Sequence, residues 1–378
     1  MKKLISIVLL TAMALAIFAG CSSKEETTTA APTTRATTSA TQATTRATTA
    51  ATTAATEAPT EATTAAYEGP IHPLTGLPTD MSDEMMTRKP VAIMIGNSKD
   101  ALPQLGISQA DILIEMMAEG GTTRLMGIWQ DPSEMKRIGS VRSARPYFID
   151  MAQGLDAYFL HFGGSVPAYD AIKKRDDLVN LDGIKGGYEG SLYIRDPERK
   201  KSFAYEHTVV TSGERIEKTL AKFKNTTKKN PDQTAFNFNE EHSALSGTNA
   251  SKVTIDYFTI NKPYFVYNEE TGTYDRFQHK QKHYDAEYDQ QVSTKNIIIL
   301  EMPFEPVPGD PLKIVEVQTT GSGKGMYFCE GKMVNVKWSK AGYNKPLVLT
   351  DEKGNELKVA PGQTFLATVK TGATVTVE

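Results

Sequence analysis

Two arginines stand three positions apart in the run SVRSARP (residues 140–146), just before a predicted helix. Arg142 and Arg145 carry planar guanidinium groups with a fixed set of hydrogen-bond donors. Pro146 suits the first position of a helix, where free N–H groups also attract anions. Arg124 adds a positive charge from a neighbouring element. This pattern predicts a site for phosphate or carboxylate.

Acidic residues in the same stretch give these arginines an alternative role. Glu119 opens the connection into the strand that carries Arg124, and it belongs to the predicted site. Other carboxylates stand nearby in the sequence, at Asp111, Glu115 and Asp150. Buried arginine–carboxylate pairs commonly hold a domain together. A ligand site and a structural ion-pair network therefore both stay open.

Further polar side chains stand where the predicted strands begin or end, which is where α/β domains place their ligands. Asn97 follows the first strand, and Asp111 enters the second. Hard oxygen donors suit Mg²⁺, so a magnesium ion held by Asp111 is the one cofactor that we consider. Asp111 equally suits a cap or a turn. His161 ends another strand, as a ligand contact or as a hydrogen-bonded structural residue.

Motifs of well-known enzyme classes do not occur in the sequence. It contains no G-x-S-x-G, no P-loop and no H-E-x-x-H. His279 and His283 are four residues apart, but their context predicts a hairpin, where this spacing does not form a metal site. A formal net charge of -3 argues against nucleic acid as the main partner. We expect a protein that binds a ligand rather than one that catalyses a reaction.

The first residues have the pattern of a lipoprotein signal peptide (residues 1–20). A basic start precedes an apolar run at residues 4–18, which is too short to span a membrane and ends at Ala19-Gly20-Cys21. A signal peptidase requires small residues before a cysteine that will carry lipid. We therefore expect Cys21 to be diacylated and to anchor the chain to the membrane, on the extracellular face of the cytoplasmic membrane.

Residues 21–66 are expected to form a disordered tether. The 45 positions after Cys21 contain 18 Thr and 14 Ala, and such a composition cannot bury a core. The segment suits a tether that lifts a domain off the membrane and into a cell wall. A spacer that only aids solubility is equally compatible.

The chemistry-bearing residues belong to an α/β domain predicted for residues 67–224. Four strands of a mixed sheet are expected there, at residues 91–95, 112–117, 125–129 and 137–141. Their apolar runs are typical of strands that are buried on both faces. A helix is expected to follow Pro146, and another to follow Ser212, which is a suitable N-cap.

The second half of the chain has a different pattern. Residues 225–249 are polar and are expected to be a linker. Residues 250–378 contain short alternating strands separated by turn signals, which predicts a β-rich C-terminal domain. Its many tyrosines and phenylalanines are more typical of a core than of a docking surface.

Several stretches resemble the YerB-type lipoproteins of Gram-positive bacteria. They are PVAIMIGN, ISQADILIEMMAEGGTTRLMGIWQ, KRIGSVRSARPYF, HFGGSVPAYDAI, TYDRF, GSGKGMYF and APGQTF. The resemblance covers nearly all of residues 70–370, and VRSARPYF is its most specific part. It implies a lipid-anchored extracellular protein with two domains and no assigned biochemical role.

The first domain also bears a remote resemblance to the LytR-CpsA-Psr phosphotransferases, which attach polyprenyl-linked glycans to peptidoglycan. The resemblance implies that Asn97 and Asp111 match acidic residues that bind Mg²⁺, and that Arg142 matches an arginine that binds pyrophosphate. Three departures matter. Asn97 stands where that family has an acid, Gln109 or Ala110 stands where an arginine usually precedes the second aspartate, and Ser143 stands where an aspartate usually follows the arginine.

The leading hypothesis is a tethered cell-envelope protein that binds an anionic envelope ligand or wall component through Arg124, Arg142 and Arg145, without catalysis. The first alternative is a magnesium-dependent envelope glycan phosphotransferase that uses Asp111. The second alternative is a module at the cell surface that docks other proteins, and the sequence names no such protein.

Overall fold

The computed structural model describes residues 67–223, 227–239, 245–257, 261–309 and 314–378, all of which lie in one compact unit, Ala65–Glu378. The predicted signal peptide, Cys21 and the tether lie outside the described residues. The described helices are α1 (Asp83–Thr87), α2 (Pro146–Gly154), α3 (Val166–Lys173) and α4 (Gly213–Leu220). The expected helices after Pro146 and Ser212 are thus confirmed, and the Ser212 side chain caps α4 by accepting from Arg215 N.

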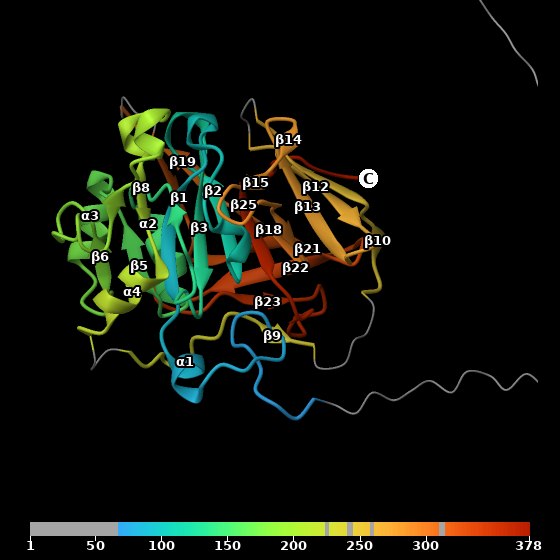
Figure 1. Cartoon of the computed structure of the whole chain (residues 1–378). Coiled ribbons are helices and arrows are strands. Elements are labelled where there is room, and N and C mark those ends of the chain that lie inside the picture. Colours follow the sequence, from blue (N-terminus) through green and yellow to red (C-terminus); the bar gives the residue numbers. More distant parts are fainter. Residues whose placement is uncertain (1–66, 224–226, 240–244, 258–260, 310–313) are drawn as a thin grey trace, which may run out of the picture. The chain divides into compact units, whose positions relative to one another are not determined.

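One large mixed sheet organises this unit (Figure 1). Ten strands follow the order β10-β22-β21-β18-β25-β2-β3-β1-β5-β6, and β23 joins at β22. They are β1 (Val91–Gly96), β2 (Ile112–Met117), β3 (Thr123–Trp129), β5 (Tyr158–His161), β6 (Asn180–Asp182), β10 (Thr248–Asn249), β18 (Asn296–Met302), β21 (Gly321–Cys329), β22 (Lys332–Lys340), β23 (Val348–Thr350) and β25 (Thr364–Lys370).

The sheet continues without a break from the N-terminal into the C-terminal half of the chain. β3 pairs antiparallel with both β1 and β2, so β1 and β2 run in the same direction. β2 then pairs in parallel with β25, with Ile112 beside Thr364, and β25 pairs in parallel with β18. The predicted fold class, a mixed sheet with helices followed by a β-rich part, is confirmed.

The central strands are mostly apolar because both of their faces are buried. In β1, Val91, Ile93 and Ile95 enter one core, and Ala92 and Met94 enter the other. Side chains of α2 and α3 pack in the second core, and side chains of α4 pack in the first. The helices thus pack on both faces of the sheet, because successive side chains of a strand point to opposite faces.

Smaller sheets cover the large one. A six-stranded sheet contains β11 (Lys252–Ile255), β12 (Tyr264–Asn268), β13 (Thr273–Gln278), β14 (Gln281–Lys282), β17 (Ser293–Thr294) and β26 (Val375–Val377). A three-stranded sheet contains β4 (Ile138–Gly139), β7 (Ile194–Arg195) and β8 (Val209–Thr211). Three pairs complete the set: β15 (Tyr284–Asp285) with β16 (Gln290–Gln291), β19 (Phe304–Pro306) with β20 (Val315–Val317), and β9 (Asn237–Phe238) with β24 (Lys358–Val359).

Two expectations about these elements need revision. The strand expected at residues 137–141 does not complete the large sheet: β4 pairs with β8 in the three-stranded sheet, and only Val141 bridges to Ile95. The segment expected as a linker, residues 225–249, contributes β9 and β10, which pair with β24 and β22 of the C-terminal half. Its polar composition reflects edge strands, which leave one side open to solvent.

A closed circle of buried polar side chains joins the two halves. Asn97 donates to Glu115 Oε1 (2.9 Å), and Arg276 donates to Glu115 Oε2 (2.8 Å). Arg276 Nη1 lies 2.5 Å from His283 Nδ1, and His283 Nε2 lies 2.8 Å from Gln104 Oε1. Gln104 donates back to Asn97 Oδ1 (3.0 Å). We call these five residues the buried polar ring.

Burial makes this ring decisive for stability. Glu115 and Arg276 are fully buried, on β2 and β13 respectively. An ion pair inside a protein repays its lost hydration only when each charge has good partners, and removal of one partner leaves the other charge buried alone. Glu115 has such partners, because Thr123 also donates to Oε1 (2.6 Å).

Arg276→Met is expected to lower the free energy of unfolding by about 3–5 kcal/mol, because it strands the Glu115 carboxylate in the core. Urea unfolding followed by circular dichroism measures this loss. Lys201→Met is the control, since Lys201 pairs with Glu198 in solvent and is expected to change stability little. Equal effects of the two substitutions would show that the ring does not hold the halves together.

Candidate functional site

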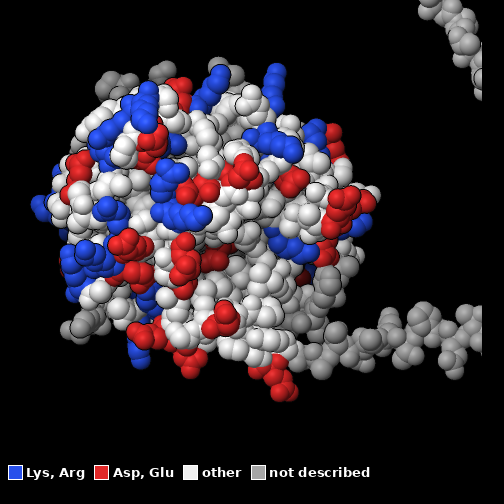
Figure 2. All heavy atoms as spheres, in the orientation of Figure 1, with Lys and Arg blue, Asp and Glu red and all other residues white. Residues whose placement is uncertain are grey.

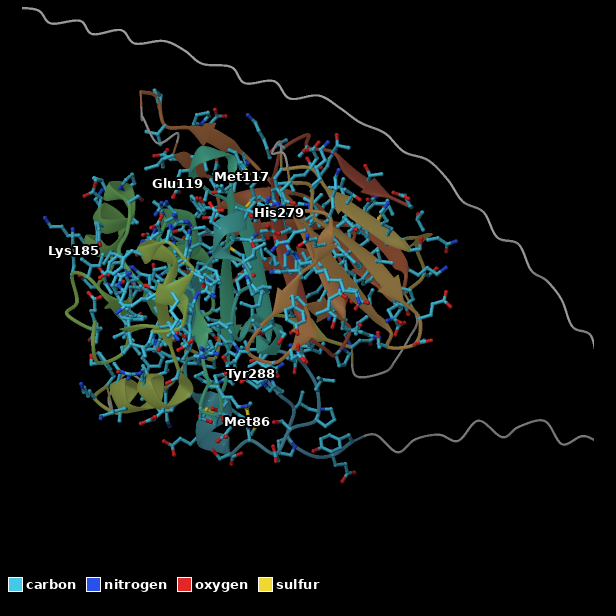
Figure 3. All side chains as sticks on the ribbon, turned by 45° about the horizontal axis from the view of Figure 1, so that its top comes forward. Met86, Met117, Glu119, Lys185, His279 and Tyr288 are labelled. Atoms are coloured by element: carbon cyan, nitrogen blue, oxygen red, sulfur yellow. The ribbon has the colours of Figure 1, made fainter. Side chains whose placement is uncertain are left out.

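The ends of several strands meet at one edge of the large sheet. β1 ends at Gly96, β2 ends at Met117 and β5 ends at His161, while the antiparallel β3 begins there at Thr123. We call this side the carboxyl edge. Figure 3 labels Met117, Glu119 and His279 close together on the side that comes forward in that view.

Six of the seven predicted binding residues stand at or next to this edge: Asn97, Glu119, Arg124, Arg142, Arg145 and His161. Asp111 does not. It precedes β2, and its N–H donates to Ile128 O at the opposite end of the strands. Asp111 precedes β2, whereas Asn97 follows β1. Because β1 and β2 run in the same direction, the two residues lie at opposite ends of the sheet. The expected convergence of Asp111 with Asn97 on one magnesium ion is therefore not found.

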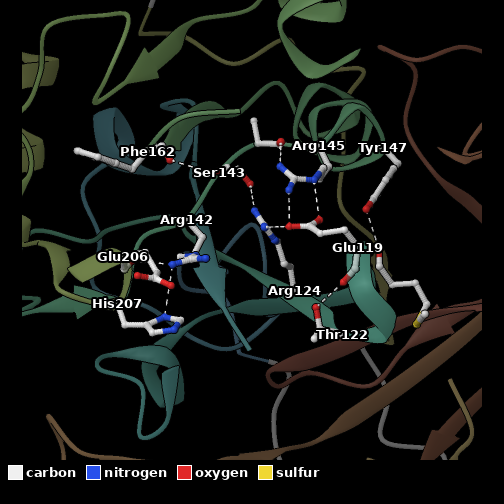
Figure 4. A network of polar contacts seen from close by, with 12 residues as sticks. Glu119, Thr122, Arg124, Arg142, Ser143, Arg145, Tyr147, Phe162, Glu206 and His207 are labelled. Carbon is white, nitrogen blue, oxygen red and sulfur yellow. Dashed lines mark hydrogen bonds and ion pairs between the residues drawn. The ribbon is translucent and has the colours of Figure 1, made fainter. Parts of the chain in front are cut away.

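Glu119 lies between two arginines at the carboxyl edge (Figure 4). Arg145 Nε donates to Glu119 Oε2 (2.9 Å), and Arg145 Nη2 donates to Oε1 (2.5 Å). Arg124 Nη2 also donates to Glu119 Oε1, and Arg124 Nη1 donates to Ser143 O (2.5 Å). We call Glu119, Arg124, Arg142 and Arg145 the arginine cluster.

The charges of this cluster do not balance. Burial opposes ionisation of Glu119, but Arg124 and Arg145 outweigh it and lower the pKa of Glu119. Burial, and then the charge of Arg145, lower the pKa of Arg124 to about 10. A single carboxylate therefore serves two buried guanidinium groups that repel each other.

Arg142 differs from the other two arginines. It is half-buried, and its Nη1 donates to Glu206 O (2.7 Å) and lies 3.4 Å from His207 Nδ1 (Figure 4). Within the described part of the chain, no carboxylate forms a hydrogen bond or ion pair with Arg142. Burial and the Arg142 charge together lower the pKa of His207. Arg142 can therefore accept an outside anion without giving up a carboxylate.

Two predicted residues are fully occupied within the protein. Asn97 belongs to the buried polar ring, where it also donates to Thr123 (2.8 Å). His161 is buried, with its ring nitrogens 2.6 Å from Gly163 O and 2.6 Å from Asn180 Oδ1. Both side chains hold the loops of the carboxyl edge in place. They are therefore hydrogen-bonded structural residues of this edge.

The sequence indicated Glu115 only as one of several possible partners of the arginines near it, and it did not single out Arg276 or His207. One signal was present: Glu115 is the lone charge in the apolar strand ILIEMM. A charge in a doubly buried strand requires a partner, and Arg276 supplies it from 161 positions away. His279 and Lys280 form the turn between β13 and β14, so the hairpin that holds His283 is confirmed.

Among the described residues, no group of three His, Cys, Asp or Glu side chains could hold a metal ion. No helix in the described ranges is long and apolar enough to cross a membrane.

Comparison with known proteins gives a consistent family assignment. Residues 74–227 match the N-terminal domain, and residues 253–366 the C-terminal domain, of a protein of unknown function, DUF3048. The predicted lipoprotein YerB of Bacillus subtilis (strain 168) is 30% identical over 299 residues, which are 78% of this chain and 84% of YerB. The crystal structure of YerB from Bacillus subtilis matches with a TM-score of 0.68 and 28% identity, over 81% of this chain and 99% of that structure.

Asp111 has a role at the opposite end of the sheet. Its carboxylate accepts from Gln130 N (2.7 Å) and lies 3.4 Å from His72 Nε2. Burial raises the pKa of Asp111 to about 7, with a smaller contribution from Asp131, although the Gln130 N–H opposes the shift. Burial lowers the pKa of His72 to about 4. Both groups are thus held neutral in mildly acidic solution.

Asp111→Asn is expected to make the folded protein less sensitive to alkaline pH. A raised folded pKa means that the Asp111 stabilisation is present below pH 4 and is lost as pH rises through 7. The stability of the variant minus that of the wild type should therefore rise by about 2 kcal/mol between pH 5 and pH 8. Urea unfolding across this range measures it.

The difference between variant and wild type isolates Asp111, because His72 is present in both proteins and its contribution is subtracted. That contribution also has the opposite sign, since it is lost as pH falls from 6.5 towards 4. Asp83→Asn, at an exposed position of α1, is the control and should show no such trend. A flat difference between pH 5 and pH 8 would contradict the assignment.

Proposed function

The chain belongs to the DUF3048 family, as its similarity to YerB also indicates, and we propose that it binds an anionic ligand through Arg142 at the carboxyl edge. The ligand class is a molecule that bears phosphate or carboxylate. The observation that carries the proposal is the uneven charge of the arginine cluster, in which three guanidinium groups have one hydrogen-bonded carboxylate among the described residues.

An incoming anion would relieve a repulsion that the fold builds in. Arg124 and Arg145 are buried and repel each other. Burial lowers the pKa of Arg142, while the Glu206 and Glu119 carboxylates each raise it by more than the charge of Arg145 lowers it. A second negative charge beside Arg142 would therefore interact favourably with all three arginines. Charge-assisted hydrogen bonds to a guanidinium are the strong kind, since donor and acceptor are both ionised.

This attraction is local. Acidic and basic side chains are interspersed over the face shown in Figure 2, in keeping with the formal net charge of -3. A ligand would thus be held by the few charges near Arg142 rather than by the field of the whole protein. Such a site favours a compact anion over a long polyanion.

We place this binding activity outside the cell, on a protein held by lipid at Cys21. The relative YerB is named as a predicted lipoprotein, which agrees with membrane anchoring of this chain. The signal peptide pattern and the Thr-rich tether support the extracellular side. The ligand would then be a component of the cell envelope.

Neither alternative gains support from the geometry. A magnesium-dependent phosphotransferase would need a carboxylate-bound metal next to the arginines, and Asp111 lies at the other end of β2. The protein-docking alternative rests on aromatic side chains of the C-terminal half, and several of those are in the core, including Tyr257, Phe265 and Tyr274. We therefore propose binding without catalysis.

Arg142→Ala is expected to weaken anion binding by about tenfold or more, which corresponds to the loss of one charged hydrogen bond. Calorimetric titration of the full chain in detergent with inorganic pyrophosphate and with citrate, each with and without Mg²⁺, measures the affinity. Citrate separates recognition of carboxylate from recognition of phosphate.

Arg215→Ala is the matched control. Arg215 is also half-buried and also donates to main-chain oxygens, among them Ser191 O (2.6 Å), but it lies on α4 away from the cluster. It should leave the affinity unchanged. The proposal fails if neither anion binds the wild type, or if both variants bind as the wild type does. Binding that requires Mg²⁺ would instead favour the phosphotransferase.

A further inference from the structure

The most exposed large apolar side chains of the described chain gather around the arginine cluster. Val166 is 74% exposed, Tyr205 is 65% exposed and Ile184 is 59% exposed, and these are the three highest values for such side chains in the described ranges. A single exposed apolar side chain is common on any protein, whereas a group of them marks a binding surface. We call these three residues the apolar patch.

Ile184 and Val166 border the short run that joins the arginines at positions 142 and 145. A Cβ atom on Gly163 would lie 3.0 Å from Ile184 Cδ1 and 3.4 Å from Ser143 Oγ, so these two side chains flank the same point. Val166 is the first residue of α3, and the N–H of the residue before it donates to Ala144 O (3.3 Å). Both apolar side chains therefore stand beside the segment that carries the arginines.

Tyr205 adjoins Arg142 through the main chain. Arg142 Nη1 donates to the main-chain oxygen of Glu206, the residue that follows Tyr205 (Figure 4). The guanidinium carbon of Arg195 lies 3.8 Å from the centre of the Tyr205 ring and 5.0 Å from the centre of the Phe162 ring. Since Phe162 precedes residue 163 in the chain, apolar side chains and guanidinium groups share one continuous surface.

We propose that the anion bound at Arg142 also carries an apolar group, a hydrocarbon chain or ring, which packs on the apolar patch. The inference rests on the proposed function, because Arg142 holds the charged end of the ligand. A simple anion would leave the patch in water. An anion with an attached apolar group removes apolar surface of both molecules from water, and this adds to the attraction between the charges.

Two other occupants of the apolar patch are less consistent with its surroundings. A stable protein interface takes about 20–30 residues on each side, and three apolar side chains are few for it. An anionic membrane surface would meet the exposed carboxylates of Glu189 and Glu206, which stand beside Arg195 and Arg142. A single small anion is able to contact Arg142 without covering those carboxylates.

Two matched pairs of anions test the inference. Methyl phosphate and butyl phosphate differ by three methylene groups, as do acetate and pentanoate, and all four dissolve in water. Each is titrated by calorimetry into the full chain in detergent. In the pair whose charged group the site recognises, the longer anion is expected to bind about tenfold more tightly, as when about half of the added apolar surface leaves water.

A double variant, Val166→Ser with Ile184→Ser, should reduce this tenfold difference to about twofold. The fold is at little risk, because both side chains are mostly exposed. Leu77→Ser is the matched control, since Leu77 is also an exposed apolar residue. It lies in an arm whose Thr75 O accepts from Gly362 N, just before β25 begins at the opposite end of the sheet. This control should keep the tenfold difference.

The outcomes separate this inference from the proposed function. Equal affinities within a pair that binds would overturn the inference, leave the anion site in place and point to a protein as the occupant of the apolar patch. A tenfold difference that persists in the double variant, or that is also lost in Leu77→Ser, would overturn the inference too. If no member of either pair binds, the proposed function fails and this inference fails with it.

Discussion

The ion pair between Glu115 and Arg276 is the interaction on which the arrangement of the two halves depends. It joins β2 of the large sheet to β13 of the covering sheet, and both side chains are fully buried. Such a pair is tolerated only when every charged atom has partners, and the ring supplies most of them through Asn97, His283 and Gln104. The Arg276 Nε atom is an exception, with no hydrogen-bond partner in the described chain. Hydrogen bonds have preferred directions, so the ring fixes how the covering sheet is positioned on the large sheet. Apolar contacts alone would define this position less strictly.

The ring also determines what the carboxyl edge can do. The side chains of Asn97 and Thr123 donate hydrogen bonds to Glu115, so the ring fixes the position of the end of β1 and of the start of β3. Side chains that point away from the ring remain for recognition. Next to the turn at residues 119–121 these are guanidinium groups. The rigid edge thus holds them in place, which is how a scaffold positions binding groups on loops.

The sequence predicted the elements well and their long-range partners poorly. Continuous apolar runs identified β1, β2 and β3, because a strand buried on both faces has no polar side to show. The run SVRSARP correctly predicted a helix start, and the rule that ligands meet strand ends placed the arginines at one edge. Two errors have one cause. The positions of Asp111 and of β4 depend on strand direction and pairing, which alternation of residue types does not encode. The partnership of Glu115 with Arg276 joins residues 161 positions apart and leaves only an unexplained charge as its local signal.

Burial separates the roles of three arginines that the sequence treated alike. Arg124 and Arg145 are 6% and 5% exposed and share Glu119, so any ligand that took their hydrogen bonds would leave that half-buried carboxylate without these partners. Leaving this carboxylate without its arginine partners costs more free energy than one hydrogen bond from Arg124 or Arg145 to a ligand would contribute. Arg142 donates to the main-chain oxygen of Glu206 and lies 3.4 Å from His207 Nδ1, and water can replace these neutral partners. The two buried arginines are therefore best understood as the source of a fixed positive field, and Arg142 as the group that meets the ligand.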